Sequence, residues 1–89
     1  MTIERDATIV NSLGMHARPA AQVVKLAATF ASEIVIERDG QTVNGKSIMG
    51  VMTLAAECGA VVRVRATGID AQAAVDALIV LIANGFGES

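Results

Sequence analysis

The chain has 89 residues, of which 53% are hydrophobic and only two are aromatic, and its net charge is −2 at neutral pH. This length predicts one domain over residues 1–89 with a single two-layer core. The absence of a basic run argues against nucleic-acid binding, and no apolar stretch is long enough for membrane insertion. With a charged N-terminal segment unlike a signal peptide, we expect a soluble, cytoplasmic protein.

In the first half of the chain, hydrophobic periodicity predicts a strand, a helix and a hairpin. Ile3–Val10 alternates apolar and polar residues with the period of a strand. A helix is expected from about His16 to Ala31, because apolar residues there recur every three or four positions. Glu33–Arg38 and Gln41–Val43 predict two strands, and the Asp39-Gly40 pair between them is typical of a two-residue hairpin turn.

The second half of the chain predicts a short helix, a strand and a long helix. Ser47 is placed to cap the short helix, which runs from Ile48 to about Leu54. Ala60–Thr67 alternates as a strand. Asp70 is placed to cap the long helix, and Asn84-Gly85 is typical of a helix C-terminus. The apolar stripe of this last helix is formed by Ala71, Ala74, Val75, Leu78, Ile79 and Ile82.

The predicted order of elements is therefore βαββαβα. Strands alternating with amphipathic helices in this arrangement favour one antiparallel sheet with every helix packed on the same face. The sequence predicts an α+β fold in two layers, with a four-stranded sheet and three helices. The second face of the sheet would be open to solvent.

The segment Gly14-Met15-His16-Ala17-Arg18-Pro19-Ala20 joins a glycine-containing loop to the start of the first helix. The N–H groups of Ala17 and Arg18, the positive end of the helix dipole and the Arg18 guanidinium should converge near His16. This combination predicts an anion site around a nucleophilic imidazole. Ser12 is a candidate further donor, although as a turn residue it could bond its own backbone instead. The chemistry indicated is transient phosphorylation of a histidine nitrogen.

Two segments carry a resemblance to a known family. The run from Gly14 to Ala21 resembles the active-site signature of HPr, the histidine phosphocarrier of the bacterial phosphoenolpyruvate-dependent phosphotransferase system. The run from Asn44 to Met52 resembles the regulatory-serine region of that family, at the expected separation from the first. The resemblance covers essentially the whole chain and implies the open-faced β-sandwich fold.

The resemblance also implies a function and a set of partners. His16 would accept a phosphoryl group from enzyme I and donate it to enzyme IIA domains, with Arg18 stabilising the phosphate. Ser47 would be a regulatory site for HPr kinase/phosphorylase, and its alternative role is that of a helix cap alone. Such a protein is a substrate of its partners and not an enzyme, needs no cofactor, and is expected to be a monomer.

Apolar residues surround too much of the short predicted helix for all of them to be buried. If these residues are exposed beside His16, they would form a docking patch. The resemblance implies that such a patch binds both the phosphoryl donor and the phosphoryl acceptor. Methionine suits this role because it adapts to several partners. Burial in the core is the alternative for each of them. The candidate docking residues are Ala21, Ile48, Met49 and Met52.

Two other classes of function are alternatives to a phosphocarrier. A regulatory binding module that acts by phosphorylation state is the first, since Gly14-Met15-His16 and Asn84-Gly85-Phe86 resemble NPr, the carrier of the nitrogen-related branch. A histidine-dependent hydrolase is the second, and it is disfavoured because no second histidine and no Ser/Cys–His–Asp set is evident. The single Cys58 permits no disulfide framework, and together with His16 it cannot build a zinc site, so no metal is expected.

Overall fold

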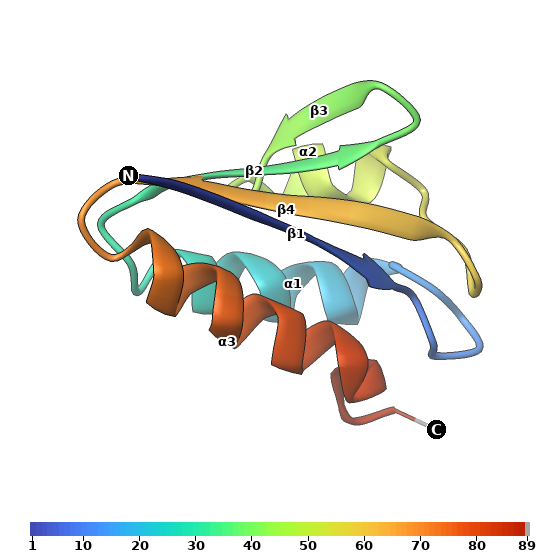
Figure 1. The fold of residues 1–89 in the computed structure, drawn as a ribbon. Helices are drawn as coiled ribbons and strands as arrows, with labels where there is room; N and C mark the ends of the chain where they lie inside the picture. The colour runs from blue at the N-terminus through green and yellow to red at the C-terminus, as the bar shows by residue number, and fades with distance from the viewer. Residues whose placement is uncertain (89) are drawn as a thin grey trace.

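The computed structural model describes residues 1–88. It consists of a four-stranded sheet with helices packed on one face (Figure 1). The strand order is β1-β4-β2-β3, and every neighbouring pair is antiparallel. The predicted fold class, an α+β open-faced sandwich, is confirmed. In chain order the elements are β1 (Thr2–Thr8), α1 (Ala17–Ala27), β2 (Glu33–Arg38), β3 (Gln41–Asn44), α2 (Ile48–Thr53), β4 (Val61–Thr67), α3 (Ala71–Ala83) and the 3-10 turn η1 (Gly85–Gly87).

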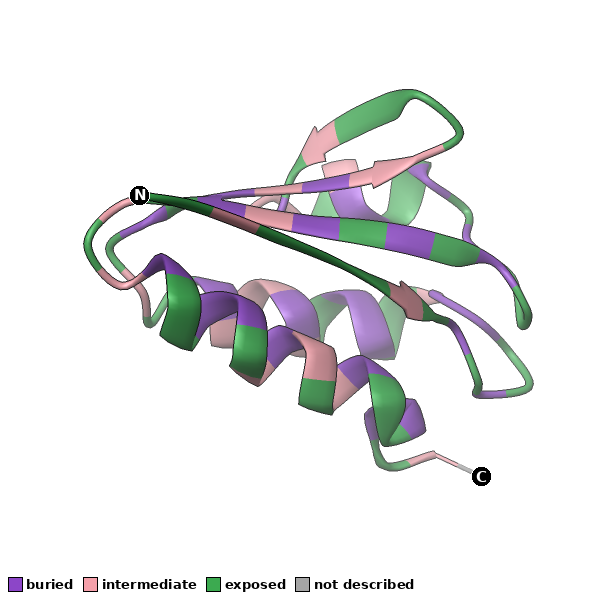
Figure 2. Ribbon diagram, in the orientation of Figure 1, coloured by how far each residue is buried: buried purple, intermediate pink, exposed green. Residues whose placement is uncertain are grey.

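Alternation along the strands decides which face of the sheet is buried. In β4, Val64 is fully buried while its neighbour Arg63 is exposed on the other face, and Figure 2 shows this alternation along the strand. α1 and α3 lie side by side across the buried face, and α2 packs against α1 and β3 (Figure 1). Val23 of α1 and Leu78 of α3 are fully buried in this layer. Complete burial of a side chain of this kind stabilises the fold by about 1.5–3 kcal/mol.

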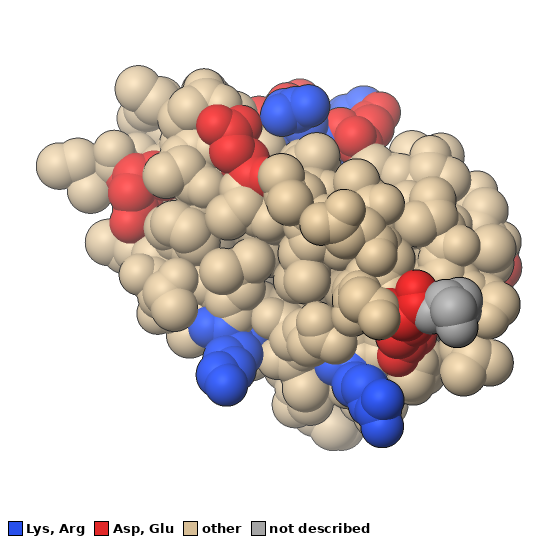
Figure 3. Space-filling model, turned by 90° about the horizontal axis from the view of Figure 1, so that it is seen from below, with Lys and Arg blue, Asp and Glu red and all other residues tan. Residues whose placement is uncertain are grey.

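The two outer surfaces of the molecule differ in charge. The open face of the sheet carries ion pairs between neighbouring strands, including Arg63 Nε with Asp6 Oδ1 at 2.9 Å and an Arg65 nitrogen with Glu4 Oε2 at 3.7 Å. The middle of the helical face is instead a broad surface of uncharged side chains, with the charged groups toward its edges (Figure 3). Exposed ion pairs contribute at most about 1 kcal/mol each, so packing on the helical side dominates the stability.

The first helix is shorter than its apolar pattern predicts, because it ends at Ala27 and not at Ala31. The N–H groups of Ala31 and Ser32 donate to the Asp70 carboxylate at 2.8 and 2.9 Å, so they cannot continue the helical ladder. The same contact corrects the expectation that Asp70 caps α3. Asp70 occupies the N-cap position, but its side chain makes no capping hydrogen bond and ties the α1–β2 connection to the start of α3.

Most of the other expected boundaries hold to within one or two residues. The Asp39-Gly40 turn is confirmed: Arg38 pairs with Gln41, and the turn residues have φ of 51° and 84°, as a type I′ hairpin requires. β1 begins one residue earlier and ends two residues earlier than expected. Ile9 is nevertheless fully buried, and its N–H donates to the Ala60 carbonyl at 2.8 Å. Within residues 1–88, no helix combines the length and the apolar character needed to cross a membrane.

Candidate functional site

A tight loop delivers His16 to the start of α1. Gly14 has φ of 70°, and a Cβ at this position would lie 2.6 Å from the Ala56 carbonyl oxygen, so only glycine fits the loop here. The next residue, Met15, is buried and donates its N–H to the same carbonyl at 2.8 Å. The loop is therefore fixed against the segment that precedes β4, and the position of His16 is fixed with it.

His16 occupies the N-cap position of α1, in agreement with the sequence prediction. Its backbone is extended and its carbonyl accepts the first helical hydrogen bond, from Ala20 N–H at 3.0 Å, but its side chain makes no capping bond. A helix leaves the N–H groups of its first turn without helical acceptors, and Pro19 has no N–H to leave. The N–H groups of Ala17 and Arg18 thus remain at the positive end of an 11-residue helix.

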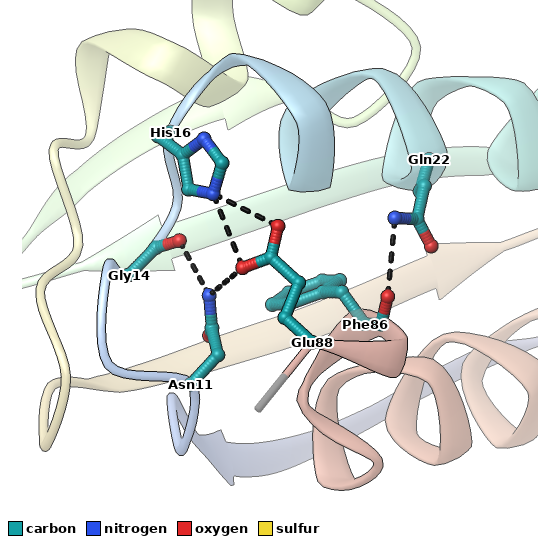
Figure 4. Close-up of polar contacts among 6 residues, drawn as sticks. All are labelled: Asn11, Gly14, His16, Gln22, Phe86 and Glu88. Carbon is teal, nitrogen blue, oxygen red and sulfur yellow. Dashed lines mark hydrogen bonds and ion pairs between the residues drawn. The ribbon is translucent and has the colours of Figure 1, made fainter.

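The C-terminal segment brings a carboxylate to His16 that the sequence did not predict. Glu88 Oε2 and Oε1 lie 2.9 and 3.1 Å from His16 Nε2 (Figure 4). Asn11, a buried residue, donates its Nδ2–H groups to Glu88 Oε1 at 3.0 Å and to the Gly14 carbonyl at 2.8 Å. The hydrogen bond with His16 is the main cause of a lowered pKa at the Glu88 carboxyl, with smaller contributions from Asn11 and from the nearby positive charge of Arg18.

A shallow hollow surrounds the imidazole and is open to solvent. Leu13, His16, Arg18, Gly87 and Glu88 line it. The His16 side chain is 35% exposed and the Glu88 side chain 17% exposed, so a partner protein can reach the ring without unfolding of the site. Arg18 is exposed at the rim of this hollow, which places it beside His16, in agreement with the predicted convergence of the two residues.

Ser12 and the apolar docking candidates are on the surface. Ser12 is exposed in the loop before Gly14, and its predicted contact with phosphate stays a prediction. Ala17 and Ala21 are exposed on α1, and α2 packs against this helix. The three larger candidates are also exposed, which excludes the alternative that they are fully buried in the core: Ile48 at 41%, Met49 at 75% and Met52 at 40%. Their use in docking stays a prediction.

Ser47 caps α2, as the sequence predicts. Its Oγ accepts a hydrogen bond from the Gly50 N–H at 3.2 Å, and the residue is partly buried. The neighbouring Lys46 donates through Nζ to the Phe30 carbonyl at 2.7 Å, which links the start of α2 to the connection between α1 and β2. The capping role is therefore established by geometry, while the regulatory role of Ser47 stays a prediction.

Comparison with known proteins identifies the family. The family profile described as the phosphotransferase-system HPr component phosphorylation site matches residues 3–84. This chain belongs to the HPr family. It is 51% identical over 86 residues to the phosphocarrier protein HPr of Cupriavidus necator, with 97% of each chain covered. HPr proteins are phosphocarriers of the phosphotransferase system, which confirms the resemblance drawn from the sequence.

Solved HPr structures share the fold closely. The crystal structure of HPr from Thermoanaerobacter tengcongensis superposes with a TM-score of 0.94 at 46% identity, covering 98% of both chains. A second structure from that organism, described as an HPr dimer, has a TM-score of 0.78 at 49% identity and covers 90% of this chain and 92% of its own. The monomer expected here therefore remains a prediction.

Four residues of the site were missed in the sequence: Asn11, Leu13, Gly87 and Glu88. Leu13 is 73% exposed beside His16 and extends the apolar surface there, but a leucine in a predicted loop carries no signal of exposure. Asn11 could have been singled out as a turn-forming residue before a glycine, although not as a donor to Glu88. Glu88 lies outside both segments that carry the resemblance and beyond the family match, which ends at residue 84, and no local pattern gives it a partner.

Proposed function

We propose that this HPr protein works in the cytoplasm as a carrier that accepts a phosphoryl group on His16 from enzyme I and donates it to enzyme IIA domains. The observation that carries the proposal is the half-buried imidazole at an uncapped helix N-terminus, beside the Arg18 guanidinium. Helix N–H groups and a guanidinium both favour phosphate oxygens.

The chemistry needs only a nucleophile and a place for the transferred charge. A ring nitrogen of His16 attacks the phosphorus of the donor's phosphohistidine, the donor's P–N bond breaks, and its electron pair returns to the donor ring. The dianionic phosphoryl group would then accept hydrogen bonds from the N–H groups of Ala17 and Arg18 and from the Arg18 side chain. Ser12 is the candidate for a further donor. Since the partners' active sites complete each step, this protein is a substrate of two enzymes and is not itself an enzyme.

The exposed apolar residues next to His16 support a docking role. Ala21, Ile48, Met49 and Met52 form what we term the docking patch, on the exposed parts of α1 and α2. Clustered exposed apolar residues on a small protein commonly mark an interaction site, and methionine adapts to partners of different shape. We propose that enzyme I and enzyme IIA use this patch in turn, with the carrier monomeric between encounters.

The experiment that tests the carrier function is phosphorylation by enzyme I and labelled phosphoenolpyruvate. Wild-type protein should take up one label that is acid-labile and alkali-stable, as a phosphoramidate is. His16→Ala should take up none and keep the circular-dichroism spectrum of the wild type. Labelling of the variant at the wild-type level would contradict the proposal.

Ser47 is the second proposed phosphorylation site, with HPr kinase/phosphorylase as its enzyme. A phosphoserine at the N-terminus of α2 would meet a favourable helix dipole, so the fold should tolerate it. The added charge would lie next to Ile48 and Met49, within the docking patch. It would therefore weaken association with enzyme I without altering His16.

A further inference from the structure

The one histidine of this chain has a carboxylate on one ring nitrogen and solvent at the other. Glu88 Oε2 lies 2.9 Å from His16 Nε2, and Figure 4 shows the second ring nitrogen, Nδ1, pointing away from Glu88. The structure gives Nδ1 no hydrogen-bond partner among residues 1–88. Because an ionised carboxylate only accepts hydrogen bonds, the proton of a neutral ring must be on Nε2 for this contact to form. Nδ1 then carries the free lone pair.

The backbone before Glu88 holds its carboxylate in this place. Gly85, Phe86 and Gly87 have φ of 62°, 59° and 75°, a left-handed stretch that is strained at the phenylalanine. The Phe86 ring is buried in the core with 3% exposure, which offsets that strain, and its carbonyl accepts a hydrogen bond from Gln22 Nε2 at 3.1 Å. Glu88 is thereby anchored to both α1 and the core.

Asn11 fixes the carboxylate from the other side. It is 2% exposed, and its Nδ2 group bridges the Gly14 carbonyl and Glu88 Oε1. The loop that places His16 and the segment that places Glu88 are thus joined by one side chain. A contact built from three separate segments of the chain is more than the chance approach of a terminal side chain.

We propose that Glu88 is a positioning residue for phosphoryl transfer: its carboxylate accepts the Nε2 proton of His16, presents Nδ1 as the nucleophile, and stabilises the positive charge of the phosphorylated ring. The proposal rests on the carrier function proposed above. In that function the N–H groups of Ala17 and Arg18 and the Arg18 side chain would bind phosphate, whereas Glu88 acts only through the imidazole. The arrangement is comparable to a carboxylate that orients a catalytic histidine and stabilises its imidazolium form.

The step balances without a proton transfer. Nδ1 donates its lone pair to the phosphorus of the donor's phosphohistidine, and the electron pair of the breaking P–N bond goes to the donor nitrogen. The His16 ring becomes positively charged, with the proton still on Nε2 and hydrogen-bonded to Glu88. On transfer to the acceptor, the Nδ1–P bond breaks, its electron pair returns to Nδ1, and the ring is again neutral with the Nε2 proton in place.

Steady-state kinetics with enzyme I and phosphoenolpyruvate test this role. Glu88→Gln keeps the size of the side chain and removes its charge, so kcat for the carrier as substrate should fall about tenfold while KM stays unchanged. Glu33→Gln is the matched control, because Glu33 is an exposed residue at the start of β2 and does not line the hollow around His16; it should behave as wild type. Unchanged or faster transfer by Glu88→Gln would overturn the proposal, the faster outcome meaning that Glu88 blocks the site.

Nuclear magnetic resonance supplies a readout that a merely structural role would not move. With ¹⁵N-labelled histidine, the single ring of this protein should show a slowly exchanging Nε2 proton at mildly alkaline pH. Glu88→Ala should lose that slow exchange while its backbone amide spectrum stays folded. Rapid exchange of the proton in the wild type would overturn the proposal. The carrier function is judged separately by His16→Ala labelling, so the failure of one claim is distinguishable from the failure of the other.

Discussion

The two helices nearest the site begin in opposite ways. α1 follows His16, whose backbone is extended (φ −81°, ψ −168°) and whose side chain makes no capping bond. α2 follows Ser47, also extended (φ −114°, ψ 115°), whose Oγ accepts from the Gly50 N–H at 3.2 Å. The backbone enters both helices in a similar conformation, so the difference lies in the side chain at the N-cap.

This difference separates a helix start that stabilises the fold from one that is available for chemistry. Ser47 satisfies an unpaired N–H within the chain, which is worth about 1 kcal/mol to a helix. His16 makes no such capping bond, and in the proposed function the N–H groups of Ala17 and Arg18 would instead bind the transferred phosphoryl group. The missing side-chain cap at α1 has a cost in stability that the proposed phosphoryl transfer would explain.

The largest effect should come from giving α1 the cap that α2 has. His16→Ser should abolish labelling by enzyme I, because the nucleophilic ring is gone. It should nevertheless be more stable than His16→Ala by about 1 kcal/mol, since a serine at the N-cap accepts a first-turn hydrogen bond that alanine cannot. Chemical denaturation of the two variants measures this difference. Equal stability of His16→Ser and His16→Ala would show that a serine at this N-cap position makes no capping hydrogen bond. The contrast drawn here between α1 and α2 would then be wrong.

Removing the guanidinium beside the uncapped terminus should have the next largest effect. Arg18→Ala should slow phosphoryl transfer by roughly one to three powers of ten, the range expected for one charge-assisted contact to a transferring phosphate. Lys25→Ala is the control, because Lys25 is an exposed cation in the last turn of the same helix. Rapid-quench measurement of label transfer decides the matter: if Arg18→Ala and Lys25→Ala transfer equally fast, Arg18 has no phosphate role.

At the capped terminus, substitutions should act on stability and docking and leave the chemistry intact. Ser47→Ala should lower the free energy of unfolding by about 1 kcal/mol and leave the enzyme I reaction unchanged. Ser47→Asp should keep or raise the melting temperature but raise KM for enzyme I severalfold, since its charge lies next to Met49. A KM equal to that of the wild type would reduce Ser47 to a helix cap.

The smallest expected effect is on the stability of the fold at low pH. The Glu88 carboxyl has a pKa below its ordinary 4.5, chiefly because of its hydrogen bond with His16. Between the lowered pKa and 4.5, the Glu88 carboxyl is therefore more protonated in the unfolded chain than in the folded one. The stability that this contact supplies is present above pH 4.5 and is lost as the pH falls through the lowered pKa of Glu88. Melting temperatures of wild type and Glu88→Gln should accordingly converge in acid. The difference between wild type and Ser47→Ala should not depend on pH, because the Ser47 cap contains no titrating group.

Much of the fold and part of the site follow from local sequence. Alternation in Val61–Thr67 and the Asp39-Gly40 turn place two strands, and the stripe from Ala71 to Ile82 places the last helix. His16 at a helix start and Ser47 as a cap were both predicted, because capping and helix initiation depend on residues within one turn of each other. These features need no knowledge of distant parts of the chain.

Tertiary structure decided what depends on segments far apart in the sequence. Asp70 looks locally like a helix cap, but its carboxylate accepts from the N–H groups of Ala31 and Ser32, 39 and 38 residues away, in the connection that follows α1. Glu88 looks like a solvated terminal residue, yet its carboxylate lies on a ring 72 residues away. The sequence by itself determined the elements, the place of His16 at the start of α1 and the Ser47 cap, since each follows from short-range periodicity and backbone geometry. The partners of carboxylates were settled only by packing, because a charged side chain bonds whichever donors the folded chain brings within about 3 Å.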